Sequence, residues 1–155
     1  MSIEIERKFL LKNDDWKHEK KTQRFYQQAY FCNTLKVSVR VRISDDEAWV
    51  SFKSSTKNIS RYEFEYNVPL ADAQHMIEEF AQGSVISKIR YFVPIGQHIY
   101  EIDVFEGDNA GLVVAEVELS DEQEEFIKPN WLGKEVSDDV RYFNNNLVGH
   151  PYKEW

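Results

Sequence analysis

The feature that most constrains this chain is an alternation of charged and apolar residues within short segments that recur along its length. The first segment, residues 2–11, carries Glu4, Glu6 and Lys8 at every second position and mostly apolar residues between them. Successive side chains of a β-strand point to opposite faces, so this pattern predicts a strand with one charged and one largely apolar face. The same criterion predicts eight strands, at about residues 2–11, 24–33, 36–45, 47–55, 60–68, 86–94, 97–107 and 112–119.

Eight strands are enough to close a barrel, and short connections such as Asp45-Asp46 and Gly96-Gln97 suit antiparallel hairpins. Helices are expected to be few. Spacing and capping signals predict them at residues 71–82, at 120–129 after a capping box and before Pro129, at about 137–147, and as one turn at 13–16. The predicted fold class is therefore α+β, an eight-stranded antiparallel β-barrel with flanking helices in a single domain over residues 1–155.

The charged positions of the predicted strands come in pairs of like sign, two residues apart. The doubly acidic pairs are Glu4/Glu6, Glu63/Glu65, Glu101/Asp103 and Glu116/Glu118, and the doubly basic pairs are Arg40/Arg42 and Lys88/Arg90. Each single strand could present such residues to solvent, as ordinary antiparallel strands do. Their recurrence favours a different arrangement, because like charges so close together repel unless a ligand lies between them.

If the charged faces point into the barrel, carboxylates and cations converge on one channel. Clustered carboxylates are the hard oxygen ligands that Mg²⁺ or Mn²⁺ requires, whereas the lone Cys32 and four scattered histidines do not suit zinc. Arginine forks and lysine point charges match a row of phosphate oxygens. The combination predicts a metal ion together with a triphosphate.

The remaining composition excludes other classes of function. A net charge of -8 argues against general binding to a nucleic-acid backbone. No apolar run is long enough to cross a bilayer, and the charged N-terminus lacks the features of a secretory signal, so we expect no membrane partner and a cytoplasmic location. The residues do not decide the oligomeric state, and a homodimer is left open.

At the charged positions the sequence resembles the CYTH family, also called triphosphate tunnel metalloenzymes. Glu4-Ile5-Glu6-Arg7-Lys8 is similar to the ExExK signature of that family, and the downstream charged motifs follow in the family's order. The segment that closes the chain, with Trp131-Leu132-Gly133 and then Arg141, is similar to the end of small bacterial members. The resemblance covers essentially the whole chain and implies a tunnel of eight antiparallel strands, Mg²⁺ or Mn²⁺ as cofactor, and a small-molecule substrate that contains a triphosphate.

Within the family the sequence most resembles the small bacterial inorganic triphosphatases. This implies Tyr30 and Lys8 as catalytic residues, with Tyr30 as proton acceptor beside the Lys8 cation. A hypothesis follows in which the triphosphate lies along Lys8, Arg40, Arg42, Lys53, Lys88 and Arg90, and some of Glu4, Glu6, Asp103, Glu116 and Glu118 hold the metal. Glu63, Glu65 and Glu101 hold a second metal or balance the basic residues, and Arg141 pairs with tunnel carboxylates.

Three alternatives stay open beside inorganic triphosphatase activity. The same tunnel in an adenylyl cyclase would bind ATP, and the ribose hydroxyl would replace water as the nucleophile. A nucleoside or thiamine triphosphatase would act on an organic triphosphate. A binder of polyphosphate without catalysis needs the cations, but it does not need the paired carboxylates or Tyr30.

Overall fold

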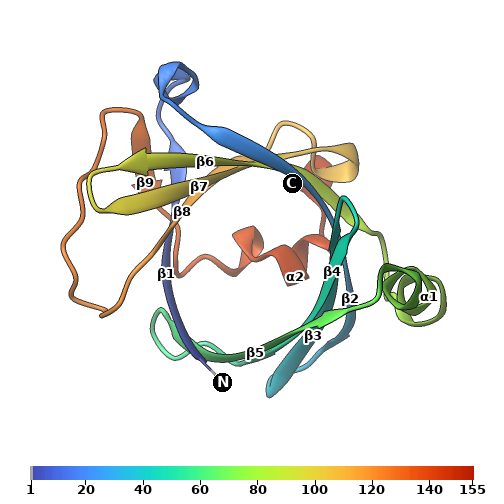
Figure 1. Cartoon of the computed structure of the whole chain (residues 1–155). Coiled ribbons are helices and arrows are strands. Elements are labelled where there is room, and N and C mark those ends of the chain that lie inside the picture. Colours follow the sequence, from blue (N-terminus) through green and yellow to red (C-terminus); the bar gives the residue numbers. More distant parts are fainter. Residues whose placement is uncertain (1) are drawn as a thin grey trace.

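The computed structural model describes residues 2–155, and its eight long strands form a closed antiparallel barrel (Figure 1). The strands are β1 (Ser2–Leu11), β2 (Thr22–Asn33), β3 (Val37–Ser44), β4 (Glu47–Ser54), β5 (Ser60–Val68), β6 (Ile86–Ile95), β7 (His98–Phe105) and β8 (Val113–Glu118). Their order is β5-β4-β3-β2-β6-β7-β8-β1, and β1 pairs back with β5 to close the ring. The predicted α+β fold and eight-stranded barrel are confirmed.

The barrel is closed by a short seam. Residues 2–5 of β1 pair with β5, and residues 6–10 of the same strand pair with β8. The C-terminal end of β1 also pairs with β9 (Leu132–Glu135), a strand that the sequence did not predict. Gly133 explains how β9 comes so close, because a Cβ atom there would stand 2.8 Å from the carbonyl oxygen of Leu10.

Two hairpins follow the predicted turn chemistry. The β3–β4 turn places Asp45 at φ 54°, and the β6–β7 turn places Gly96 at φ 62°. Both values lie in the left-handed region that Asp tolerates and Gly adopts readily, which suits the two-residue turns joining twisted strands. These turns fix the register of the two hairpins, which places Arg40, Arg42, Lys88 and Arg90 on the inner face of the barrel.

The helices agree less well with the predictions. Helix α1 (Leu70–Phe80) matches the predicted helix at 71–82, and the turn predicted at 13–16 is the 3-10 helix η1 (Asp15–His18). The helix predicted at 120–129 is wrong, since residues 119–130 are all described and hold no helix. There Asp121 accepts a hydrogen bond from the Gln123 backbone and Glu124 accepts one from Ser120, so side chains bind the amides locally in a turn.

The helix predicted at 137–147 is divided into two short pieces, η3 (Val140–Tyr142) and α2 (Asn144–Leu147). Phe143 separates them with an extended backbone, φ −72° and ψ 130°. The remaining short elements are the 3-10 helices η2 (Gly107–Asn109) and η4 (Tyr152–Glu154). In Figure 1, α1 lies outside the barrel wall beside β2, β3 and β4. In the same view, which looks down the barrel axis, α2 lies within the ring of strands.

The buried apolar residues form three clusters, two against the outer faces of the strands and one inside the barrel at one end. One cluster lies under α1 against β2, β3 and β4, and the largest packs the loop that contains Trp131 against the outer faces of β1, β7 and β8. A third cluster fills the inside of the barrel at the end next to α2, with the side chains Tyr30, Ile86, Phe105, Leu112, Val114 and Leu147. The inward positions therefore change from charged to apolar toward α2. None of the helices in residues 2–155 is long and apolar enough to span a membrane.

Candidate active site

A cavity of about 270 Å³ lies inside the barrel, and we call it the tunnel. All eight barrel strands contribute to its wall. The predicted site residues that line it are Glu4, Glu6, Lys8, Tyr30, Arg40, Arg42, Lys53, Glu63, Glu65, Lys88, Arg90, Glu101, Glu116 and Glu118. The alternation of charged and apolar residues therefore identified the inner face of each strand. Two predicted residues lie elsewhere, Asp103 and Arg141.

Asp103 lies behind the tunnel wall. It is fully buried, its Oδ1 accepts from Arg90 Nε at 2.7 Å, and its Oδ2 accepts from Lys88 Nζ at 2.7 Å. Burial alone would raise the pKa of Asp103, but Arg90 and Lys88 outweigh that effect and lower it. Both of its oxygens are occupied by cations, so this position does not agree with the predicted role of Asp103 as a metal ligand.

Lys88 is the most deeply buried cation of the tunnel. Burial lowers the pKa of Lys88 to about 7, because Asp103 only partly compensates and Arg90 lies next to it. Its Nζ also donates to Oδ1 of Asn144 at 2.9 Å. Asn144 belongs to α2, so the C-terminal segment supplies a hydrogen-bond acceptor for the Lys88 ammonium group.

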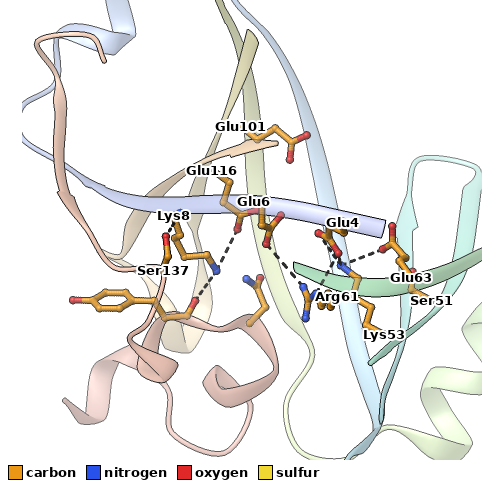
Figure 2. Close-up of polar contacts among 12 residues, drawn as sticks. Glu4, Glu6, Lys8, Ser51, Lys53, Arg61, Glu63, Glu101, Glu116 and Ser137 are labelled. Atoms are coloured by element: carbon orange, nitrogen blue, oxygen red, sulfur yellow. Dashed lines mark hydrogen bonds and ion pairs between the residues drawn. The ribbon is translucent and has the colours of Figure 1, made fainter. Parts of the chain in front are cut away.

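Lys8 is held by the same segment. Its Nζ lies 3.3 Å from Glu116 (Figure 2). The Nζ also donates to the Tyr142 carbonyl at 3.0 Å and lies 5.7 Å from the centre of the Phe143 ring. No contact joins Lys8 to Tyr30 among the described residues, although both line the tunnel. Tyr30 instead accepts a long hydrogen bond of 3.5 Å from Gln28. The structure brings the two predicted catalytic residues to one cavity without pairing them.

The carboxylates of β1 meet those of β8 and the cations of β4 and β5. The register places Glu6 directly opposite Glu118 and Lys8 opposite Glu116. Glu4 binds Lys53 at 3.0 Å. Burial would raise the pKa of Glu4, but Lys53 and a neighbouring arginine lower it overall.

Glu6 and Glu118 are the least compensated acids of the tunnel. Glu118 has no ion-pair partner within residues 2–155, and the cation nearest Glu6 is 3.9 Å away. Burial, followed by Glu116 and Glu4, raises the pKa of Glu6 well above its ordinary value, and burial and Glu4 raise the pKa of Glu118. Two acids opposed across adjacent strands destabilise the barrel unless a cation or a proton lies between them.

Arg42 is the corresponding uncompensated cation. It has no ion pair or side-chain hydrogen bond in the described part of the chain, and its Nε is buried without a partner. Its guanidinium lies 4.8 Å from the centre of the Tyr26 ring. Burial, with Arg40 and Arg90 close by, lowers the pKa of Arg42 to about 10. Arg40, by contrast, is 3.6 Å from Glu65. The tunnel thus contains a cation that lacks an anion.

Arg141 is an exposed residue whose NH2 lies 2.6 Å from Asp139, outside the tunnel lining. The predicted pairing of Arg141 with tunnel carboxylates therefore does not agree with the structure. Asp139 also caps the short helix η3 by accepting a hydrogen bond from the Arg141 backbone. None of the four histidines lines the tunnel, and His98 contacts Glu124 at the barrel exterior.

The sequence prediction missed several lining residues, among them the cation Arg61 and the C-terminal residues Phe143 and Asn144. Arg61 shares the inner face of β5 with Glu63 and Glu65, so the alternation of that strand was the signal that could have revealed it. Phe143 and Asn144 reach the tunnel because the helical path is interrupted at Phe143, and no periodic pattern in the sequence predicts that break.

The donor chemistry suits a hard divalent cation. Glu4, Glu6 and Glu118 supply carboxylate oxygens, which Mg²⁺ and Mn²⁺ prefer. As the side chains stand, no three acidic, histidine or cysteine residues of the described chain are gathered closely enough to hold an ion. The opposed Glu6 and Glu118, which no cation balances, are the observation that favours a metal at this wall.

The fold and the charged tunnel agree with the sequence comparisons. The profile of the CYTH domain family matches residues 2–152, so this chain belongs to the CYTH domain family. A relative from Acetivibrio thermocellus named inorganic triphosphatase is 41% identical over 155 residues, which is 100% of this chain and 99% of the relative.

A second inorganic triphosphatase, from Nitrosomonas europaea, is 33% identical over 94% of this chain and 96% of its own length. A crystal structure of an inorganic triphosphatase superposes with a TM-score of 0.67 at 30% identity, covering 96% of this chain and 95% of that one. The family resemblance inferred from the charged motifs is confirmed.

Proposed function

We propose that this chain hydrolyses inorganic triphosphate with Mg²⁺ or Mn²⁺ as cofactor. The observation that carries the proposal is Arg42, a half-buried tunnel cation that has no anion among the described residues and whose Nε is buried without a partner. A ligand that brings several negative charges removes this imbalance. The names of two relatives that match over nearly their full lengths support the same substrate.

The size of the tunnel favours inorganic triphosphate over an organic one. Its volume of about 270 Å³ lies at the lower limit of the roughly 300–1,000 Å³ typical of pockets for drug-sized ligands. The apolar cluster around Tyr30 and Leu147 fills the barrel at one end. A compact chain of phosphates suits the remaining space, whereas a nucleoside would have to lie outside it.

The tunnel residues then have separate tasks. Arg40, Arg42, Lys53, Lys88 and Arg90 bind and orient the phosphate oxygens. Glu4, Glu6 and Glu118 are the proposed metal ligands, and the bound ion would neutralise charge on the phosphates. Glu116 and the Tyr142 carbonyl fix Lys8 at the tunnel wall. Tyr30 is the proposed group that orients the attacking water and accepts its proton.

The test is phosphate release from inorganic triphosphate, ATP and thiamine triphosphate, each with Mg²⁺, Mn²⁺ or EDTA, with cyclic AMP scored in the ATP reaction. We expect fast, metal-dependent release from inorganic triphosphate and slow release from the other two. Cyclic AMP and pyrophosphate from ATP would replace the proposal with a cyclase. Tight binding of tripolyphosphate without any release would replace it with a binder.

A further inference from the structure

Arg61 occupies the wall of the tunnel at which the metal is proposed to bind. Its Nε lies 3.2 Å from Glu4, and its NH2 lies 3.9 Å from Glu6 (Figure 2). The register explains this position, because Arg61 is the direct cross-strand partner of Glu4 at the seam between β1 and β5. One guanidinium therefore reaches two carboxylates that lie two residues apart on one strand.

The cations around Glu4 differ in their other partners. Lys53 contacts Glu4 at 3.0 Å but also Glu63 at 3.2 Å, so it keeps an acid if Glu4 turns away. Arg61 has no ion-pair partner in residues 2–155 besides Glu4 and Glu6. Burial would lower the pKa of Arg61, but these two acids raise it overall, so the guanidinium stays charged.

Exposure identifies which cation has room to move. The Arg61 side chain is 23% exposed, against 10% for Lys53. The Glu6 contact is also much longer than the Glu4 contact, so it is the weaker of the two. An ion that approaches Glu6 meets a cation that is loosely held on that side and next to solvent.

We infer that Arg61 is a resident cation that competes with the divalent metal for Glu4 and Glu6. It balances these carboxylates while no metal is bound, and it withdraws from Glu6 when the ion enters. The inference rests on the proposed function, because it takes Glu4 and Glu6 as metal ligands. Its consequence is that the empty tunnel holds metal weakly.

The competition is measured by titrating the full-length protein with Mn²⁺ alone and following the free ion by its paramagnetic resonance, without substrate. Removing one positive charge within several ångströms of a divalent ion should tighten binding roughly tenfold in Arg61→Gln. Arg61→Lys keeps the charge but not the planar fork, and its affinity should fall between those of the wild type and Arg61→Gln.

The matched control is Arg7→Gln, which removes an arginine adjacent to Glu6 in the sequence but on the outer face, where it pairs with Glu135 at 3.0 Å. Its Mn²⁺ affinity should stay within about twofold of the wild type, since solvent screens that charge. Urea unfolding of each variant verifies that the barrel is intact.

An unchanged or weaker Mn²⁺ affinity in Arg61→Gln would overturn the inference. Weaker affinity would show that Arg61 holds the ligands in place, and unchanged affinity that it serves only the phosphates. If the wild type hydrolyses tripolyphosphate while Arg61→Gln binds Mn²⁺ no more tightly, the inference fails and the proposed function stands. If Mn²⁺ binding tightens but no tripolyphosphate is hydrolysed, the function fails and the inference stands.

Discussion

Both walls of the tunnel contain buried acidic side chains, but the two walls differ in whether cations of the protein compensate them. On the wall of β6 and β7, Asp103 is fully buried and its oxygens are occupied by Lys88 and Arg90 at 2.7 Å. On the wall of β1 and β8, Glu6 and Glu118 face each other without a close cation. The protein compensates the buried acid of the first wall with two cations, whereas no cation in residues 2–155 lies closer than 3.9 Å to the Glu6/Glu118 pair of the second wall. We infer that the compensated wall positions the substrate and that the uncompensated wall receives an ion.

Replacing Asp103 should have the largest effect, because it leaves two buried cations unpaired. We expect Asp103→Asn to lower the free energy of unfolding by about 3–5 kcal/mol, the cost typical of breaking a buried ion pair. Urea unfolding measures it. The control is Asp108→Asn, whose exposed pair with Lys153 at 2.8 Å should contribute no more than about 1 kcal/mol. Equal losses in both variants would contradict the distinction between the walls.

Removing the uncompensated cation should affect binding far more than folding. We expect Arg42→Ala to lower kcat/KM for tripolyphosphate by roughly 10²–10³-fold, comparable to the loss of one preorganised donor to developing charge. Its free energy of unfolding should change little, because no ion pair is broken. Arg42→Lys should recover part of the activity, since it restores the charge without the fork. A large loss of stability together with activity would mean that Arg42 is structural.

The uncompensated carboxylates should make metal-free stability fall as pH rises. Raised pKa values of Glu6 and Glu118 mean that the folded state holds protons that the unfolded state has lost. The stability that these groups contribute is therefore present below pH 4.5, the ordinary pKa of a glutamate side chain, and is lost as the pH rises through their raised pKa values. Urea midpoints in EDTA over this window measure it, and Glu118→Gln should flatten the slope. A rising slope that Glu118→Gln leaves unchanged would assign the effect to other groups.

The sequence predicted the fold well where one local rule decides the structure. Alternation predicted all eight barrel strands with bounds that lie within about two residues of the observed ones, because one face of each strand is charged and the other apolar. It failed where tertiary contacts decide. Strand β9 has only four residues, too few for a pattern, and forms because Gly133 lets it approach β1.

The same limit applies to the site. Alternation gives the face of a residue but not its partners, so Asp103 was grouped with the metal ligands although two cations enclose it. Arg61 follows the alternation, but it is only the second residue of β5, and its place in the tunnel depends on the seam between β5 and β1. Asn144 lines the tunnel because the helix breaks at Phe143. Its hydrogen bond with Lys88 joins parts of the chain that are distant in sequence, which a local pattern does not predict.

The smallest effect is expected at Asn144, which connects the compensated wall to the C-terminal segment. Its Oδ1 accepts from both Lys88 at 2.9 Å and Gln28 at 3.0 Å. Asn144→Ala removes two hydrogen bonds, but Lys88 keeps Asp103, so we expect a loss of about 1–3 kcal/mol in unfolding free energy and a several-fold rise in KM. Asn144→Asp keeps the acceptor and adds an anion beside Lys88, which should restore stability while the added charge repels the triphosphate. If both variants bind tripolyphosphate as the wild type does, the C-terminal segment closes the barrel without helping to hold the substrate.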